Sequence, residues 1–347
     1  MNVILLAAGL GTRLLPLTAV LPKCLMPIHG RPQLEYWLRA LSQTQGAFEA
    51  DIVVNTHYLP ELVREYLEHS PWDGRVRLVH EAELLGTGGT LLANSFPSGG
   101  PVMLVHADNL CSADLQAFMA AHANRSPGTV MTMMSFRTDA PKTCGILDLD
   151  KRGVVRAFHE KVADPPGNLA NAAVYIVEPE VTAYIAGLGR RVVDFSTEVI
   201  PHFLGRIQSW ENDGYHRDIG NVDSFLAAQE EFPVPESNPV VEPDGWLRLC
   251  RKDGGALPRA FAKALAQALD LPMVKGNVTP PKDPVLLLLP DDRSLLDRAA
   301  GRRQFALASG SIIAIEYSAG ESAQTALPLY AWGWQVITIC AVTKERL

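Results

Sequence analysis

The sequence predicts a doubly wound α/β fold followed by a smaller second domain. Three observations carry this prediction. Apolar strand-like runs alternate with amphipathic helical stripes over the first 125 residues. The connections become short after Pro127, and a Pro-rich acidic stretch occupies residues 233–245. At 347 residues the chain is also about two to three times the usual size of one domain.

The first half shows the alternation most clearly. Strands are expected at 2–8, 51–55, 76–80 and 101–107, and helices at 32–41, 59–67 and 115–122. The first run, NVILLAA, is continuously apolar, as in a strand that is buried on both faces of a parallel sheet. Pro32 is suited to the first turn of the helix that follows, because its missing N–H is not needed there.

The second half favours a mixed sheet and a separate tail. Strands are expected at 129–137, 145–150, 153–159 and 172–177, and helices near 178, near 196 and at 222–231. We therefore predict a first domain over 1–232, a linker over 233–245 and a C-terminal domain over 246–347. The tail carries a helical pattern at 259–269 and strand patterns at 285–289, 311–317 and 335–342, which indicate a small α/β or α+β domain of unknown role.

Composition excludes several functions. With 31 Lys and Arg against 38 Asp and Glu, the net charge of −7 argues against nucleic-acid binding but not against a small phosphorylated substrate. The apolar runs are too short to span a membrane. Five cysteines without a CxxC motif are typical of a reducing compartment, so a cytoplasmic protein is expected.

A glycine-rich loop directly follows the first strand. Gly9 and Gly11 allow close backbone approach to a ligand, while Arg13 and Lys23 add two cations suited to phosphate oxygens. A dinucleotide fingerprint would need a glycine at Leu14, and the GK[ST] of a Walker loop is absent. The residues therefore indicate a polyphosphate cradle at the carboxyl end of the sheet, with a plain tight turn as the alternative.

The loop resembles the signature of a known family. The segments GLGTRLLPLT and LPKCLMPI resemble the pattern GxGxRLxPLTxxxPKxxxP of the sugar-1-phosphate nucleotidyltransferases. The matching positions are Gly9, Gly11, Arg13, Leu14, Pro16, Leu17, Thr18, Pro22, Lys23 and Pro27. The resemblance covers roughly residues 1–231 and implies a Rossmann-like mixed sheet of the glycosyltransferase-A-like nucleotidyltransferase kind. It implies nucleotide contacts at Leu6, Ala7, Gly9, Gly11, Thr12, Gly86, Thr87 and Gly88.

Further segments extend the resemblance, with some departures. The segment at 85–89 resembles a second nucleotide loop, and residues 158–161 resemble an FxEK motif. Residues 171–175 match an N.G.Y strand, although Ala173 stands where glycine is common. Residues 216–220 match a DIG segment.

The implied reaction joins a nucleoside triphosphate to a sugar 1-phosphate and releases pyrophosphate. The resemblance gives Arg13 and Lys23 catalytic roles on the triphosphate. It assigns the sugar phosphate to Gly145, Glu160, Lys161 and Asn171, and Mg²⁺ to Asp108 and Asp218. From the residues alone, Asp108 is equally a strand-end cap, Lys161 a surface lysine and Asn171 a buried amide contact.

The expectation for the nucleotide base and the sugar rests on one segment only. Residues 81–90 look most like those of guanylyltransferases for mannose or manno-heptose 1-phosphates, so GTP is expected, with UTP or dTTP as alternatives. A regulatory relative without turnover is a second hypothesis, although such relatives tend to lose the residues that are present here. The sequence leaves a homo-oligomer open.

Overall fold

The computed structural model describes most of the first 233 residues and isolated parts of the tail. It describes 1–28, 31–45, 51–94, 96 and 99–233. Beyond them it describes 260, 263–264, 266–268 and four short strands. The predicted linker at 233–245 lies almost wholly outside these residues, so the domain boundary stays a prediction.

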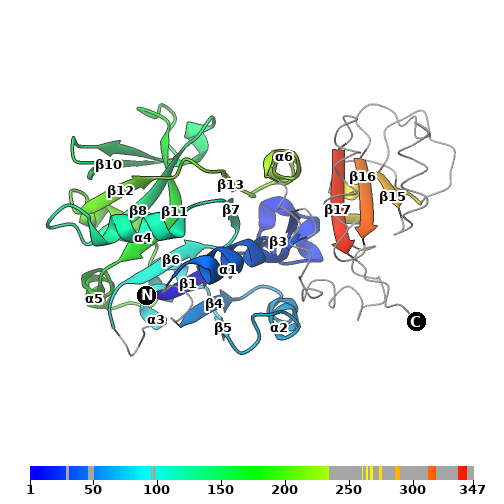
Figure 1. Cartoon of the computed structure of the whole chain (residues 1–347), viewed down its shortest axis with the longest axis horizontal. Helices are drawn as coiled ribbons and strands as arrows, with labels where there is room; N and C mark the ends of the chain where they lie inside the picture. The colour runs from blue at the N-terminus through cyan, green and yellow to red at the C-terminus, as the bar shows by residue number, and fades with distance from the viewer. Residues whose placement is uncertain are drawn as a thin grey trace. The chain divides into compact units, whose positions relative to one another are not determined.

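A mixed sheet of nine strands forms the framework of the first part (Figure 1). Its main path runs in the order β10-β9-β11-β6-β1-β4-β5, and β8 joins β11 to β12. The strands are β1 (Asn2–Leu6), β4 (Ile52–Thr56), β5 (Val76–His80), β6 (Val102–His106), β8 (Met131–Arg137), β9 (Gly145–Leu149), β10 (Val155–Glu160), β11 (Leu169–Val177) and β12 (Ile207–Glu211). Four of them, β6, β1, β4 and β5, are mutually parallel, so their carboxyl ends share one edge. Ligands of open α/β sheets bind at such an edge.

The structure describes six α-helices in full, together with several shorter elements. They are α1 (Gln33–Gln43), α2 (Pro60–Glu68), α3 (Gly86–Ala93), α4 (Leu115–Ala123), α5 (Pro179–Gly187) and α6 (Val222–Glu231). Helix α4 packs on β8 and β12. The short strands are β2 (Pro27–Ile28), β3 (Arg31–Pro32), β7 (Asn109–Cys111) and β13 (His216–Asp218). No helix among the described residues is both long and apolar enough to cross a membrane.

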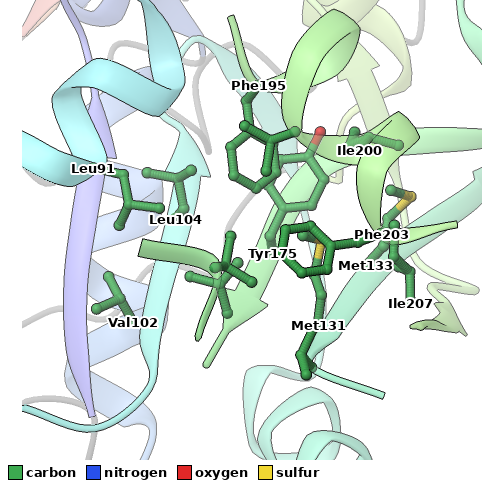
Figure 2. Packing of buried hydrophobic residues seen from close by; sticks show 14 of the residues in the cluster. Leu91, Val102, Leu104, Met131, Met133, Tyr175, Phe195, Ile200, Phe203 and Ile207 are labelled. Atoms are coloured by element: carbon green, nitrogen blue, oxygen red, sulfur yellow. The ribbon is translucent and has the colours of Figure 1, made fainter. Parts of the chain in front are cut away.

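The hydrophobic core lies between the sheet and the segment that follows α5. The rings of Tyr175 in β11 and Phe195 pack with their centroids 4.9 Å apart. Figure 2 shows these two side chains, and Phe203 near Met131 and Met133. These side chains are almost fully buried. Burial of aromatic and β-branched side chains on this scale anchors the segment at 190–203 to the sheet.

The tail contains a small parallel sheet. Its strands are β14 (Met273–Lys275), β15 (Leu286–Leu289), β16 (Ile312–Tyr317) and β17 (Gln335–Ala341), in that order. The expected strand patterns at 285–289, 311–317 and 335–342 are therefore found as strands, apart from end residues that lie outside the described residues.

Two compact units divide the chain. The first contains Met1–Gly9, Tyr36–His57 and Gly74–His216, and the second contains Leu10–Glu35, Tyr58–Asp73 and Arg217–Leu347. The nine-stranded sheet belongs to the first unit. The glycine loop after β1 continues into the second.

Most of the expected strands and helices agree with the structure, but the short strands β2, β3, β7 and β13 and the tail strand β14 were not expected. The mixed sheet is confirmed. The segment at 85–89, expected as a loop, is instead the start of helix α3, and the strand β12 was not expected. Near 196 the chain forms a single π-helical turn, Phe195–Val199, and a 3₁₀ turn, Ile200–Phe203.

Candidate active site

The first glycine loop turns sharply at Gly11. Its φ of 62° lies in the left-handed region, and a Cβ there would stand 2.7 Å from Thr18 Cγ2. The Thr18 hydroxyl donates a hydrogen bond of 2.9 Å to the Gly11 carbonyl, which holds the turn from inside. Thr12 then begins a short 3₁₀ turn, Thr12–Leu14. Glycine is thus required at position 11 for both conformation and space.

Three charged residues that the sequence singled out meet in the second unit. Lys23 Nζ lies 2.8 Å from Asp218 Oδ1, and Arg13 Nη2 lies 3.6 Å from Asp218 Oδ2. The Lys23 side chain is only 8% exposed, whereas those of Asp218 and Arg13 are 52% and 70% exposed. An ammonium that has lost most of its water must be paired, and Asp218 supplies the pair. Arg13 remains largely exposed to solvent.

Gly220 provides the space for this cluster. The sequence alone did not reveal this role of the glycine. A Cβ at Gly220 would stand 2.7 Å from Asp218 Oδ2 and 2.9 Å from Arg13 Nη2. Any side chain here would push the two charged groups apart. The sequence shows this glycine in the DIG segment, but it does not show that the glycine lies beside Arg13.

The beginning of the loop is held by two hydrogen bonds in the first unit. The Leu6 carbonyl accepts a hydrogen bond of 3.0 Å from the Ala107 amide, and the Ala7 amide donates one of 2.7 Å to Asn55 Oδ1. These backbone groups of Leu6 and Ala7 therefore position the loop. Gly9 has no heavy atom within 4 Å of a Cβ built on it, so space does not explain this glycine.

The glycines of the second loop lie against the segment at 191–194. A Cβ on Gly86 would stand 2.6 Å from the Val193 carbonyl oxygen, and one on Gly88 would stand 2.9 Å from Val193 Cγ1. The Gly88 amide donates to the same carbonyl at 2.9 Å. Close packing of α3 on Val193 accounts for these glycines, and the half-buried Thr87 lies between them. Nucleotide contacts at Gly86, Thr87 and Gly88 stay a prediction.

Gly145, Glu160 and Lys161 adjoin one another where β9 pairs with β10. Gly145 is the register partner of Glu160, and a Cβ on it would stand 2.6 Å from Glu160 Oε2 and 2.5 Å from the Phe158 ring. Lys161 Nζ lies 3.4 Å from Glu160 Oε1. Lys161 has a φ of 49°, a conformation that costs a lysine free energy and that tends to occur at functional sites.

Asn171 belongs to an irregular part of β11. Its Nδ2 donates to the Tyr175 hydroxyl at 2.7 Å, and its Oδ1 accepts from the Ala173 amide at 2.9 Å. Ala173 has a φ of 55°, which favours glycine, so the glycine expected there has a structural reason. Burial raises the pKa of the Tyr175 phenol, so that group stays protonated and hydrogen-bonded.

Asp108 is half-buried between β6 and β7, in the first unit, whereas Asp218 belongs to the second. Among the described residues no group of three or more His, Cys, Asp or Glu side chains could hold a metal ion. Mg²⁺ commonly uses only one or two protein carboxylates and completes its shell with phosphates and waters. The carboxylates of Asp108 and Asp218 are therefore of the right chemistry, and their pairing stays a prediction.

Comparison with known proteins shows the family of the chain. The model of the nucleotidyl transferase family matches residues 2–233. The mannose-1-phosphate guanyltransferase of Eremothecium gossypii is 30% identical over 236 residues, which are 65% of this chain and 63% of that protein. The mannose-1-phosphate guanylyltransferase of Mycobacterium tuberculosis is also 30% identical, over 67% of this chain and 64% of its own. The chain thus spans less than two thirds of the length of these curated relatives.

A solved structure shares the fold. The putative glucose-1-phosphate thymidylyltransferase of Bacillus anthracis, in complex with a sucrose, superposes with a TM-score of 0.58 at 21% identity. The match covers 68% of this chain and 98% of that one. At this identity the likeness concerns the fold alone. Because the family model matches well over half of the residues, the chain belongs to the nucleotidyl transferase family.

Proposed function

We propose that the protein transfers a guanylyl group from GTP to a mannose- or heptose-type 1-phosphate and releases pyrophosphate. The family and the names of the curated relatives support an NDP-sugar as product. The observation that carries the proposal is the buried Lys23 paired with Asp218 beside Arg13, because a triphosphate needs cations held in place. UTP or dTTP is the alternative nucleotide.

The chemistry needs no protein nucleophile. A phosphate oxygen of the sugar 1-phosphate attacks the α-phosphorus, a new P–O bond forms, and the bond to the β-phosphate breaks. Pyrophosphate leaves with the electron pair of that bond. Lys23 neutralises charge at the α-phosphate, and the exposed Arg13 binds the β- and γ-phosphates.

The sugar phosphate binds at the residues around β9, β10 and β11. Lys161 holds its phosphate, and Glu160 and Asn171 accept or donate hydrogen bonds to sugar hydroxyls. Gly145 contributes space, because a larger residue would displace Glu160. The left-handed conformation of Lys161 supports a functional role over that of an ordinary surface lysine.

Mg²⁺ would be held by Asp108 and Asp218. When bound, it would neutralise and orient the phosphate oxygens. The residues of the chain supply the remaining interactions: Lys23 and Arg13 on the triphosphate and Lys161 on the sugar phosphate.

The proposed reaction would take place in the cytoplasm and supply sugar nucleotides for cell-surface polysaccharides. A regulatory homologue without turnover is less well supported, because Arg13, Lys23, Asp108, Lys161 and Asp218 are all present.

A screen for pyrophosphate release tests the proposal. The full chain is incubated with Mg²⁺ and each of GTP, UTP, dTTP, CTP and ATP against a panel of sugar 1-phosphates. We expect the largest kcat/KM with GTP and a mannose or manno-heptose 1-phosphate. A preference of about tenfold or more for UTP or dTTP, which corresponds to about 1.4 kcal/mol, would refute guanine specificity. Absence of release with every pair would refute the transferase.

A further inference from the structure

A buried polar network of the first unit lies between the start of the first glycine segment, at Ala7, and the second glycine segment, at residues 85–89. It consists of Asn55 at the end of β4, Glu81 directly after β5 and Thr90 in α3. The three residues are 2%, 5% and 1% exposed. Polar groups this deeply buried destabilise a protein unless they are hydrogen-bonded, so their arrangement is specific.

The network reaches the start of the first glycine loop through Asn55. The amide oxygen Oδ1 of Asn55 accepts the Ala7 amide at 2.7 Å. Its Nδ2 donates to Glu81 Oε1 at 2.9 Å. The orientation of the Asn55 amide is therefore fixed, because its oxygen must face the donor at Ala7 and its nitrogen must face the acceptor at Glu81.

The network reaches the second glycine segment through Glu81. Glu81 Oε2 accepts the Leu85 amide at 3.2 Å, directly before α3 begins. Glu81 Oε1 also accepts the Thr90 hydroxyl at 2.6 Å, within α3. A single carboxyl group therefore fixes both the entry into α3 and its first turns. A chain of four hydrogen bonds therefore fixes the position of the two segments relative to each other.

We propose that Asn55 and Glu81 are positioning residues that couple the two glycine segments, so that both are presented to one nucleotide together. This inference rests on the proposed function, because it takes these segments as the nucleotide site. Neither side chain contacts substrate in this proposal. They act through the Ala7 and Leu85 amides, and a misplacement of about 1 Å is enough to lower rates up to about 100-fold.

A reciprocal exchange tests the coupling. Glu81→Gln replaces an acceptor oxygen with a donor that faces Asn55 Nδ2 or the Leu85 amide, and Asn55→Asp places two carboxyl groups together. Each single change breaks the chain of hydrogen bonds. The double change Asn55→Asp with Glu81→Gln restores it, because the introduced carboxylate still accepts the Ala7 amide and now accepts from the introduced amide. The Thr90 hydroxyl can turn from donor to acceptor.

Steady-state kinetics with GTP, Mg²⁺ and α-D-mannose 1-phosphate provide the first readout. We expect each single variant to raise KM for GTP by about tenfold, the usual cost of a broken buried hydrogen bond, with KM for the sugar phosphate unchanged. The double variant should return to within about threefold of the wild type. A double variant no better than the worse single variant would overturn the coupling.

Amide hydrogen exchange provides a readout that does not depend on activity. Peptides that contain Ala7 and Leu85 should both exchange faster in each single variant and recover in the double variant. If either peptide is unaffected by the single changes, the coupling is wrong. If the wild type proves inactive with every substrate pair, the proposed function fails while this measurement still decides the network.

Thr132→Val serves as the matched control. Thr132 is fully buried and its hydroxyl lies 2.7 Å from His122 Nδ1, but it contacts neither glycine segment through that bond. The substitution should lower the melting temperature to an extent similar to the single variants and leave KM for GTP unchanged. An equal rise in KM for Thr132→Val would show that general destabilisation, rather than positioning, explains the effect.

Discussion

Gly220→Ala should lower activity without unfolding the protein. The new Cβ would stand 2.7 Å from Asp218 Oδ2 and 2.9 Å from Arg13 Nη2, whereas ordinary contact begins at 3.4 Å. The carboxylate oxygen must therefore retreat by about 0.7 Å and the guanidinium by about 0.5 Å. Both atoms belong to the ends of flexible and largely exposed side chains, so the backbone need not move.

The two expected effects differ in size. Exposed ion pairs contribute only about 0–1 kcal/mol to the free energy of unfolding, so Gly220→Ala should change stability by no more than about 1 kcal/mol. Displacing catalytic groups by most of an ångström should lower kcat/KM by about 10- to 100-fold. Urea unfolding and pyrophosphate release measure the two quantities on the same preparation.

Gly187→Ala is the control for the added methyl group. No heavy atom lies within 4 Å of a Cβ built on Gly187, which ends α5. It should keep full activity and gain up to about 1 kcal/mol of stability from the higher helix propensity of alanine. A Gly220→Ala enzyme with kcat/KM within twofold of the wild type would refute the reasoning, because the Arg13–Asp218 geometry would then not matter.

Three further predictions follow from other parts of the structure. Asp108→Asn and Asp218→Asn should each lower kcat by orders of magnitude, with circular dichroism unchanged in Asp108→Asn, and near-normal turnover with Mg²⁺ in both variants would contradict the metal assignment. Burial, and after it the charge of Arg125, lower the pKa of His122, although Glu178 acts in the opposite direction. At about pH 6 the unfolded chain therefore binds more protons at this residue than the folded protein does. The free energy of unfolding should then fall as pH drops below about 6.5, and His122→Gln should flatten this dependence in urea titrations. Burial raises the pKa of the Cys111 thiol to about 12, so iodoacetamide should label the partly exposed Cys144 and spare Cys111 until the protein unfolds.

The strands were predictable because their pattern is local. Continuous apolar runs such as the one at Val102–His106 mark buried strands whatever lies around them. Helix α3 was missed because three of its first four residues are glycines, which disfavour helix in isolation. Contacts with Val193, more than a hundred residues away, stabilise it instead. The strand β12 has no apolar run, and only its pairing with β8 defines it.

The sequence singled out Arg13, Lys23 and Asp218, which the structure brings together, but it did not predict their environments. The spacing of Arg13 and Lys23 in the glycine loop indicated phosphate chemistry. Neither the burial of Lys23 nor the space that Gly220 provides follows from spacing, because Asp218 is 195 residues away from Lys23 in the chain. Asn55 was not singled out from the sequence, where its only visible feature is that it is an amide at the end of an apolar strand. Its partner Glu81 becomes apparent only once β4 and β5 are paired.

The fate of a radiolabel at the α-phosphate of GTP tests the central claim most directly. In a single turnover with α-D-mannose 1-phosphate and Mg²⁺, we predict that the label appears in the sugar nucleotide and that the pyrophosphate is unlabelled. Lys23→Met should slow this transfer by about 100- to 1,000-fold, since it removes the buried cation proposed to act at the α-phosphate. Label recovered as free GMP or GDP in the wild type, or an unchanged rate in Lys23→Met, would contradict the account.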